Sequence, residues 1–171
     1  TTVCPFRVIV DTREGLPWHF TGIEADQRDG GGTLIVQLIT DRSLATGDYS
    51  IEGYENDIAI ERKSVGDWFN SIGQDRERFE REMERLAETK FAAVVIECGW
   101  QTLLFDFHQY TQMNPKITSR TIASWSVRYG VHFIPCMNRR HAELMTFQLL
   151  NQFWRQKQHE LKEGKQHDPT E

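Results

Sequence analysis

Residues 47–67 read GDYSIEGYENDIAIERKSVGD, and this stretch predicts a β-hairpin that leads into a helix. Apolar and polar residues alternate in its two arms, 47–51 and 57–63, as is typical of half-buried strands. Hydrophobic matching sets the register of such a pair of strands. The matching register puts the apolar residues on one face, with these partners opposite each other: Tyr49 and Ile60, Ile51 and Ile58. The polar side chains are then expected on the other face.

The same register brings two carboxylates face to face. Asp48 lies opposite Glu61, so their Cβ atoms are expected roughly 4.5–5.5 Å apart. Lys63 projects from the same face as Glu61, whereas Arg62 points the other way. Opposed carboxylates destabilise each other unless a cation lies between them, and their hard oxygens favour Mg²⁺ or Mn²⁺. With a nearby ammonium to hold a water or a phosphate, the hairpin predicts a phosphodiester hydrolysis site. The alternative is an amphipathic hairpin with a solvated polar face.

Three further acids are candidates for the site, namely Asp67 at the end of this stretch and Asp11 and Glu14 well before it. Ser64 and Asp67 fit a capping box at the start of the next helix, which favours a structural role for Asp67 over metal contact. Asp11 and Glu14, within VDTRE (residues 10–14), follow the first predicted strand. Because sheet ends commonly carry functional sites, both acids are candidates, although they could also be ordinary loop charges.

Composition predicts a single domain of 171 residues with a net charge of −5. The charge is uneven, because residues 114–158 hold seven Lys and Arg against one acid, or +6, which leaves −11 for the rest. This favours either an anionic partner bound by the basic segment or a basic surface without a ligand. Three cysteines without a CxxC pair, and histidines without HExxH, argue against a zinc site and for free thiols in a reducing compartment. The chain shows no signal peptide and no apolar run of the roughly 20 residues that a membrane span needs, so we expect no membrane partner and no secretion.

Periodicity along the chain predicts an α/β fold, with a mixed sheet flanked by helices on both faces. The alternating Arg and Glu of residues 76–88 predict a solvated helix face with weak ion pairs. A folded domain is expected over residues 1–158 and a polar, disordered tail over 159–171. The predicted strands cover residues 6–14, 33–40, 47–51, 57–63, 92–99 and 131–135, and the predicted helices cover 64–90, 118–130 and 140–156.

Taken together, these motifs resemble the nuclease domain of the XPF-type structure-specific DNA endonucleases, the family that includes the Mus and archaeal Hef nucleases. The family signature is GD, a spacer, and ERKxxxD, which stands complete here as Gly47-Asp48, residues 61–63 and Asp67. VDTRE matches the first family motif. SIGQDRERF (residues 71–79) and VVIE (residues 94–97) are similar to the helix and the core strand that follow.

The resemblance implies a restriction-endonuclease-like fold and Mg²⁺-dependent cleavage of branched, flap or fork DNA in repair or recombination, with Mn²⁺ as a substitute. By this resemblance Asp11, Asp48 and Glu61 would be metal ligands. Glu14 would support the site and Lys63 would position or activate the water. The remaining roles implied are structure or phosphate contact for Arg62, orientation of the network for Asp67, and substrate binding for Arg78 and for Arg120 of the basic segment.

Two alternatives to this function stay open. One is a catalytically silent scaffold of the same fold that binds DNA or a partner; the other is a phage or restriction-type nuclease with another substrate. Family members usually carry a tandem helix-hairpin-helix domain after the nuclease, which nothing here resembles. A heterodimer with a helix-hairpin-helix-bearing or helicase partner could supply this function. The aromatic-rich closing helix MTFQLLNQFW (residues 145–154) instead favours a homodimer, because some related domains dimerise through their nuclease helices. The expected location is the cytoplasm or nucleoid, or the nucleus in a eukaryote.

Overall fold

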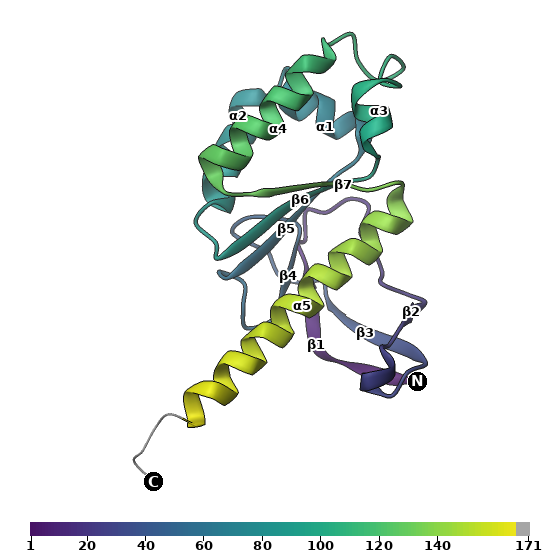
Figure 1. Ribbon diagram of the computed structural model, residues 1–171, viewed down its shortest axis with the longest axis vertical. Coiled ribbons are helices and arrows are strands. Elements are labelled where there is room, and N and C mark those ends of the chain that lie inside the picture. Colours follow the sequence, from purple (N-terminus) through teal and green to yellow (C-terminus); the bar gives the residue numbers. More distant parts are fainter. Residues whose placement is uncertain (167–171) are drawn as a thin grey trace.

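The computed structural model describes residues 1–166, which form a seven-stranded mixed sheet with helices on both faces (Figure 1). The strand order is β2-β3-β1-β4-β5-β6-β7. The strands are β1 (Thr2–Val10), β2 (Ile23–Glu24), β3 (Thr33–Ile39), β4 (Tyr49–Ile51), β5 (Ile58–Lys63), β6 (Phe91–Ile96) and β7 (His132–Pro135). The helices are α1 (Val65–Ile72), α2 (Arg76–Leu86), α3 (Trp100–Leu104), α4 (Pro115–Tyr129) and α5 (Arg139–Gln166), with a 3₁₀ turn η1 (Gln27–Asp29).

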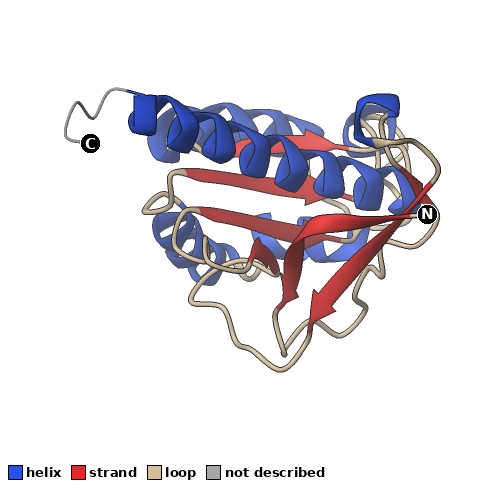
Figure 2. Cartoon of the chain, turned by 90° about the horizontal axis from the view of Figure 1, so that it is seen from below, coloured by secondary structure: helices blue, strands red, loops and turns tan. Residues whose placement is uncertain are grey.

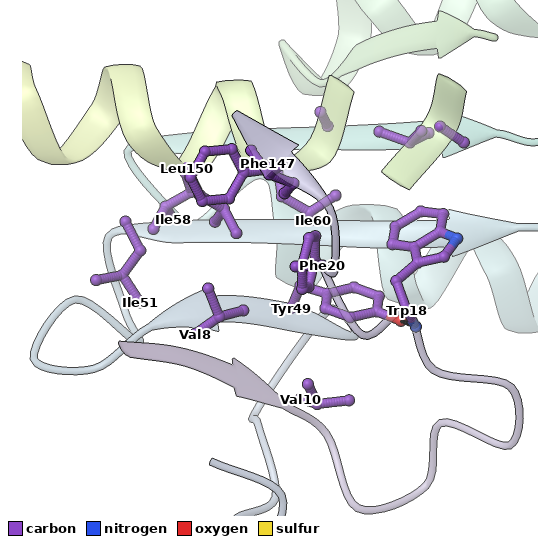
Figure 3. Packing of buried hydrophobic residues seen from close by; sticks show 14 of the residues in the cluster. Val8, Val10, Trp18, Phe20, Tyr49, Ile51, Ile58, Ile60, Phe147 and Leu150 are labelled. Atoms are coloured by element: carbon purple, nitrogen blue, oxygen red, sulfur yellow. Dashed lines mark hydrogen bonds between the residues drawn. The ribbon is translucent and has the colours of Figure 1, made fainter. Parts of the chain in front are cut away.

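Two hydrophobic cores lie on opposite faces of the sheet. On one face Phe147 and Leu150 of α5 pack against Ile58 and Ile60 of β5 (Figure 3). On the other face α1, α2 and α4 cover the sheet with a second cluster that includes Trp68, Phe79, Met83 and Trp125. Figure 2 shows helices on both sides of the strands. The predicted fold class is therefore confirmed.

The hairpin pairs in the predicted register. Tyr49 lies opposite Ile60, and the four apolar side chains of the two arms are fully buried in the α5-facing core. Strand β6 has both faces covered, as its continuous apolar sequence predicts: Val95 joins the α5-facing core and Val94 joins the other. Hydrophobic matching thus fixes which side chains of β4 and β5 face each layer.

Strand directions bring several chain segments to one edge of the sheet. β4 runs antiparallel to both β1 and β5, while β6 and β7 run parallel to β5. β1, β5, β6 and β7 therefore all end at the same edge, which we call the carboxyl edge. Asp48 precedes the antiparallel β4 and reaches this edge as well. In sheets of this kind, ligand sites commonly lie beyond the strand ends.

The helix predicted over residues 64–90 is wrong, because the chain forms two helices separated at residues 73–75. The first helix ends at Gly73, whose ψ of −108° lies outside the helical range, and the surroundings of Gly73 leave no room for a side chain. A Cβ atom there would lie 2.9 Å from the Phe69 carbonyl oxygen and 2.9 Å from Cε of Met113. The predicted start of the first helix is confirmed, since Oγ of Ser64 accepts a hydrogen bond from the Asp67 backbone N–H at 3.2 Å.

Other predicted boundaries also need correction. α4 begins three residues early, because Asn114 caps it and Pro115 takes the first helical position, which suits proline. α5 runs on to Gln166, so the prediction of a disordered tail is wrong for residues 159–166. The rest of the predicted tail lies outside the described residues. Sequence periodicity also missed the short elements β2, η1 and α3. None of the helices in residues 1–166 is long and apolar enough to cross a bilayer.

Gly47 is the position where the hairpin depends most on glycine. Its φ is +76°, and a Cβ atom would lie 3.1 Å from Cβ of Ala59 and 3.3 Å from the backbone N and O of Ile60. We predict that Gly47→Ala lowers the free energy of unfolding by about 2–3 kcal/mol in urea titrations. Gly53→Ala is the matched control, because Gly53 has a φ of +87° but open space around it. Its loss should be about 1 kcal/mol, and equal losses in the two variants would contradict the close-approach argument.

Candidate active site

The carboxyl edge gathers the charged residues of the signature, and the alternation along β5 divides them between two layers. Glu61 and Lys63 face α2, with Nζ of Lys63 3.5 Å from Oε1 of Glu61. Arg62 faces the α5 side, where its guanidinium lies 6.0 Å from the centre of the Trp18 ring. The prediction that Arg62 points away from its two neighbours is confirmed. One face of β5 therefore carries an acid and an amine, and the other carries a buried arginine.

Arg62 is clamped between two glutamates. Its Nε and Nη2 donate to the two carboxylate oxygens of Glu14 at 3.0 and 2.8 Å, and its Nη1 donates to Glu97 at 2.7 Å. The side chains of Arg62, Glu14 and Glu97 are only 8%, 5% and 8% exposed. Burial alone would raise the pKa of Glu14, but the hydrogen bonds from Arg62 outweigh it and lower that pKa below its usual value.

Glu97 extends the clamp to Trp18 and to the start of α5. Its other oxygen accepts hydrogen bonds from Nε1 of Trp18 at 3.2 Å and from Nη1 of Arg139 at 3.0 Å. Arg139 also donates to the carbonyl oxygen of Leu16 at 2.8 Å. Sequence analysis gave Glu97 no role, although a carboxylate directly after a buried strand was a usable signal. The clamp joins the ends of β1, β5 and β6 to the start of α5.

Asp48 and Glu61 form the opposed carboxylate pair. Oδ2 of Asp48 accepts the Arg62 backbone N–H at 2.8 Å, which aims this carboxylate along β5. Burial, together with the charge of Glu14, raises the pKa of Asp48 to about 7. Burial and the charge of Asp48 raise the pKa of Glu61 well above its usual value. The two side chains therefore disfavour each other's ionisation, as the sequence predicted for a pair without a cation.

Lys63 is held beside this pair by α2. Its ammonium nitrogen lies 4.3 Å from the centre of the Phe79 ring, in addition to its contact with Glu61. Both Lys63 and Glu61 have side chains only 12% exposed. An ammonium between a carboxylate and an aromatic face is attracted by both, so the amine stays at the edge of the pair.

Asp11 does not join the pair in this structure. Arg13 donates to both of its oxygens, from Nε at 2.8 Å and from Nη2 at 2.9 Å, and the Leu44 backbone N–H donates at 2.6 Å. Although burial raises the pKa of Asp11, these hydrogen bonds lower it overall. Within residues 1–166 no three acid, histidine or cysteine side chains are grouped as a metal site. The predicted set of Asp11, Asp48 and Glu61 is therefore not assembled.

Arg13 is a residue of the site that sequence analysis missed. Its hydrogen bonds to Asp11 raise its pKa, and the charges of Asp48 and Glu61 raise it further. The guanidinium therefore lies within electrostatic reach of the opposed pair, held there by Asp11. The arginine of VDTRE was visible in the sequence, but which carboxylate it faces depends on the fold.

The outer predicted residues lie farther from this centre. Asp67 is exposed at the start of α1, and its backbone serves the cap. Arg78 is exposed on α2 and makes no ion pair or hydrogen bond within the described part of the chain. Arg120 is exposed on α4, where it lines a shallow cavity of about 350 Å³ with Lys116 and Ser119. The structure thus places neither arginine among the carboxylates.

The donor set fits a hard divalent cation. Asp48 and Glu61 present buried carboxylate oxygens that repel each other, and Oε2 of Glu82 on α2 is buried with no hydrogen-bond partner in residues 1–166. A cation removes the repulsion, and oxygen ligands are those that Mg²⁺ and Mn²⁺ prefer. Asp48 and Glu61 are the residues that would hold it. Glu82 is a site residue that sequence analysis assigned to a solvated helix face.

A mixed sheet with helices on both faces and this group of acids at its carboxyl edge defines a restriction-endonuclease-like domain. A family model described as the ERCC4 domain matches residues 10–149, so the chain belongs to the ERCC4 domain family. The prediction of an XPF-type nuclease domain is confirmed.

Solved structures support the same fold. XPF from Aeropyrum pernix matches with a TM-score of 0.61 at 21% identity, over 87% of this chain and 65% of that chain. XPF from Aeropyrum pernix in complex with DNA matches with a TM-score of 0.59 at 19% identity, over 88% of this chain and 66% of that one. The chain thus spans slightly less than two thirds of the length of both. No curated protein sequence matches this chain.

The clamp yields a stability prediction. Arg62→Met should lower the free energy of unfolding by about 3–5 kcal/mol at neutral pH, because it leaves two buried glutamates without their partner. Glu14 has a lowered pKa, so the clamp stabilises the fold above the usual glutamate pKa and less as the pH falls through the lowered value. Urea titrations of both proteins across this range should show the difference shrinking in acid.

Arg7→Met is the matched control for the clamp. Arg7 also donates two hydrogen bonds to one glutamate, Glu52, but on the surface, with side chains 51% and 27% exposed. Its loss should cost at most about 1 kcal/mol. Similar losses in the free energy of unfolding of the two variants would show that burial does not make the Arg62 ion pairs more stabilising than a surface pair.

Proposed function

We propose that this domain is a metal-dependent DNA endonuclease that hydrolyses phosphodiester bonds in branched, flap or fork DNA. The observation that carries the proposal is the opposed pair Asp48 and Glu61 with Lys63 beside it, at the carboxyl edge of an ERCC4 domain. Because the chain spans less than two thirds of its solved relatives, a further domain or a partner is proposed to supply selectivity for branches.

Each side chain has a defined task in this proposal. A bound Mg²⁺ would stabilise negative charge on the phosphate and acidify a water. Asp48 and Glu61 would hold the ion through ionised oxygens, and the Arg62 backbone N–H fixes the orientation of the Asp48 carboxylate. Lys63 donates hydrogen bonds to the attacking water or to a phosphate oxygen. The buried Arg62 guanidinium keeps the strand ends, and thereby the two carboxylates, in place.

Helix α4 is the proposed contact with the DNA backbone. It contains no acid, and its cations Lys116, Arg120 and Arg128 are exposed, without ion pairs to other described residues. β7 is parallel to β6 and therefore begins at the edge of the sheet opposite the carboxyl edge. Because α4 ends just before β7, the start of α4 lies near the carboxyl edge. Much of the other excess charge in residues 114–158 is paired, for example Arg155 with Asp29 and Lys157 with Glu160. XPF from Aeropyrum pernix is known in complex with DNA, which supports a DNA partner.

One observation favours a second candidate, a catalytically silent scaffold that binds DNA or a partner. Arg13 occupies both oxygens of Asp11, so this acid is unavailable to a metal unless the ion pair opens. The retained motif residues favour the nuclease instead, since a silent scaffold has no need of them. Nicking assays on duplex, single-stranded, flap and fork DNA separate these functions: a scaffold cuts none, and a restriction-type nuclease shows no preference for branches.

Asp48→Asn tests the proposed chemistry. Asparagine keeps an acceptor for the Arg62 N–H but removes the charge, so Mg²⁺-dependent nicking of a labelled flap should fall by about 100-fold or more. In EDTA the same variant should melt at a higher temperature than the wild type, because a repelling charge is gone. Asp57→Asn, on the same hairpin and 3.3 Å from Lys90, is the control and should retain activity. Full activity in Asp48→Asn would contradict the proposal.

The double variant Lys116→Ala/Arg120→Ala tests the DNA contact. Loss of two phosphate contacts should weaken binding of a flap substrate about equally for all sequences. It should also reduce the slope of log K against log salt by about two. Arg81→Ala/Arg85→Ala removes the same charge from exposed positions on α2 and should change the slope little. Fluorescence anisotropy at several salt concentrations measures both, and equal slopes would rule out this surface.

A further inference from the structure

Glu82 differs from the other acids of α2. Glu77 and Glu84 are exposed, and Glu80 pairs with Arg76 at 3.4 Å, as expected for a solvated helix face. Oε2 of Glu82 is instead buried and has no hydrogen-bond partner among the described residues. Leaving a buried charged group unsatisfied is costly, so this oxygen is a favourable acceptor for a nearby hydrogen-bond donor. Glu82 thus needs an explanation that a surface acid does not.

The position of Glu82 connects it to the proposed site. It lies one helical turn after Phe79, and residues at this spacing share a side of the helix. Phe79 is the ring over which the Lys63 ammonium lies, at 4.3 Å from the ring centre. Glu82 is also close enough to Glu61 for its charge to raise the pKa of that carboxyl. α2 therefore brings a third carboxylate to the surroundings of Lys63 and Glu61.

In the free protein, Lys63 serves as the counter-ion of Glu61, at 3.5 Å. This arrangement cannot persist when Glu61 faces a divalent cation, because the cation takes over the carboxylate charge and repels the ammonium. An ammonium carries three donors and needs an acceptor where it is largely buried. The unpaired oxygen of Glu82 is such an acceptor, and it lies on the helix against which Lys63 already packs.

We propose that Glu82 is a positioning residue that receives the Lys63 ammonium when Glu61 engages a divalent cation. This inference rests on the proposed function. In the metal-free protein Lys63 neutralises Glu61; in the metal-bound protein it hydrogen-bonds to Glu82 and remains beside the pair. Glu82 thereby acts through Lys63 and touches neither the phosphate nor the cation.

A crystal of the wild-type protein soaked in Mn²⁺ gives the direct test. We expect the ion at Asp48 and Glu61, and Nζ of Lys63 within hydrogen-bond distance of Glu82. An ion at the pair with Lys63 still on Glu61, or with Glu82 itself bound to Mn²⁺, overturns this inference and leaves the proposed function standing. The absence of Mn²⁺ from Asp48 and Glu61 overturns both.

Kinetics of Glu82→Gln provide the second readout. Because misplacing a reacting group by about 1 Å costs up to 100-fold, kcat for flap nicking should fall about 10-fold or more, with KM for DNA unchanged. Glu82→Asp should recover part of this loss, and Glu80→Gln, which changes a half-buried acid of the same helix that pairs with Arg76, should leave kcat unchanged. Thermal unfolding in EDTA should show Glu82→Gln at least as stable as the wild type. A large drop in stability, or an unchanged kcat, would overturn the inference.

Discussion

The carboxyl edge of this domain depends on one arginine buried between two glutamates. Arg62 sits in β5, while Glu14 follows β1 and Glu97 follows β6, so its hydrogen bonds hold three separate chain segments in fixed positions. The same residue fixes Asp48 through its backbone N–H. A charged group with so little exposure is stable only when its donors are satisfied, and here the fork geometry of guanidinium matches the carboxylates. Every side chain of the candidate site is positioned relative to this clamp.

Strand alternation explains how three consecutive charged residues serve two purposes. Because successive side chains of a strand point to opposite faces, Glu61 and Lys63 share one face while Arg62 takes the other. The α5-facing side stabilises the fold through a complete set of ion pairs. The α2-facing side holds the opposed carboxylates, whose raised pKa values show that their ionisation is unfavourable in the fold. The clamp and the carboxylate pair thus lie on opposite faces of β5. The ion pairs of the clamp offset part of the free-energy cost of placing two carboxylates side by side.

Local patterns were enough to predict the hairpin, and with it the centre of the site. Hydrophobic matching placed Tyr49 opposite Ile60, and this register carried Asp48 to Glu61 without further information. The partners of Arg62 were not predictable in this way, because Glu14 and Glu97 are distant in sequence and reach it through tertiary contacts. Arg13 is only two residues from Asp11, so this ion pair was a local signal that the sequence reading overlooked. The break at Gly73 was missed as well, because a single glycine is tolerated within a helical pattern and its non-helical ψ appears only in the fold. Glu82 looked like its exposed neighbours, since nothing in the helical pattern reveals which acid lies beside β5.

The charges of the edge also imply an order of events in the proposed function. When Asp48, Glu61 and Glu82 are all ionised they outnumber the nearby cations Lys63 and Arg13, so without a divalent cation the region repels a phosphate. The exposed cations of α4 attract the DNA backbone to the same edge, but they do not neutralise the buried carboxylates. A divalent cation does so, and it thereby makes the site compatible with the phosphate that α4 brings near. Metal and DNA are then expected to favour each other's binding, and by linkage the effect must be mutual. A helix proposed to bind DNA and a repelling acidic pair on one edge are compatible only when a divalent cation lies at the pair.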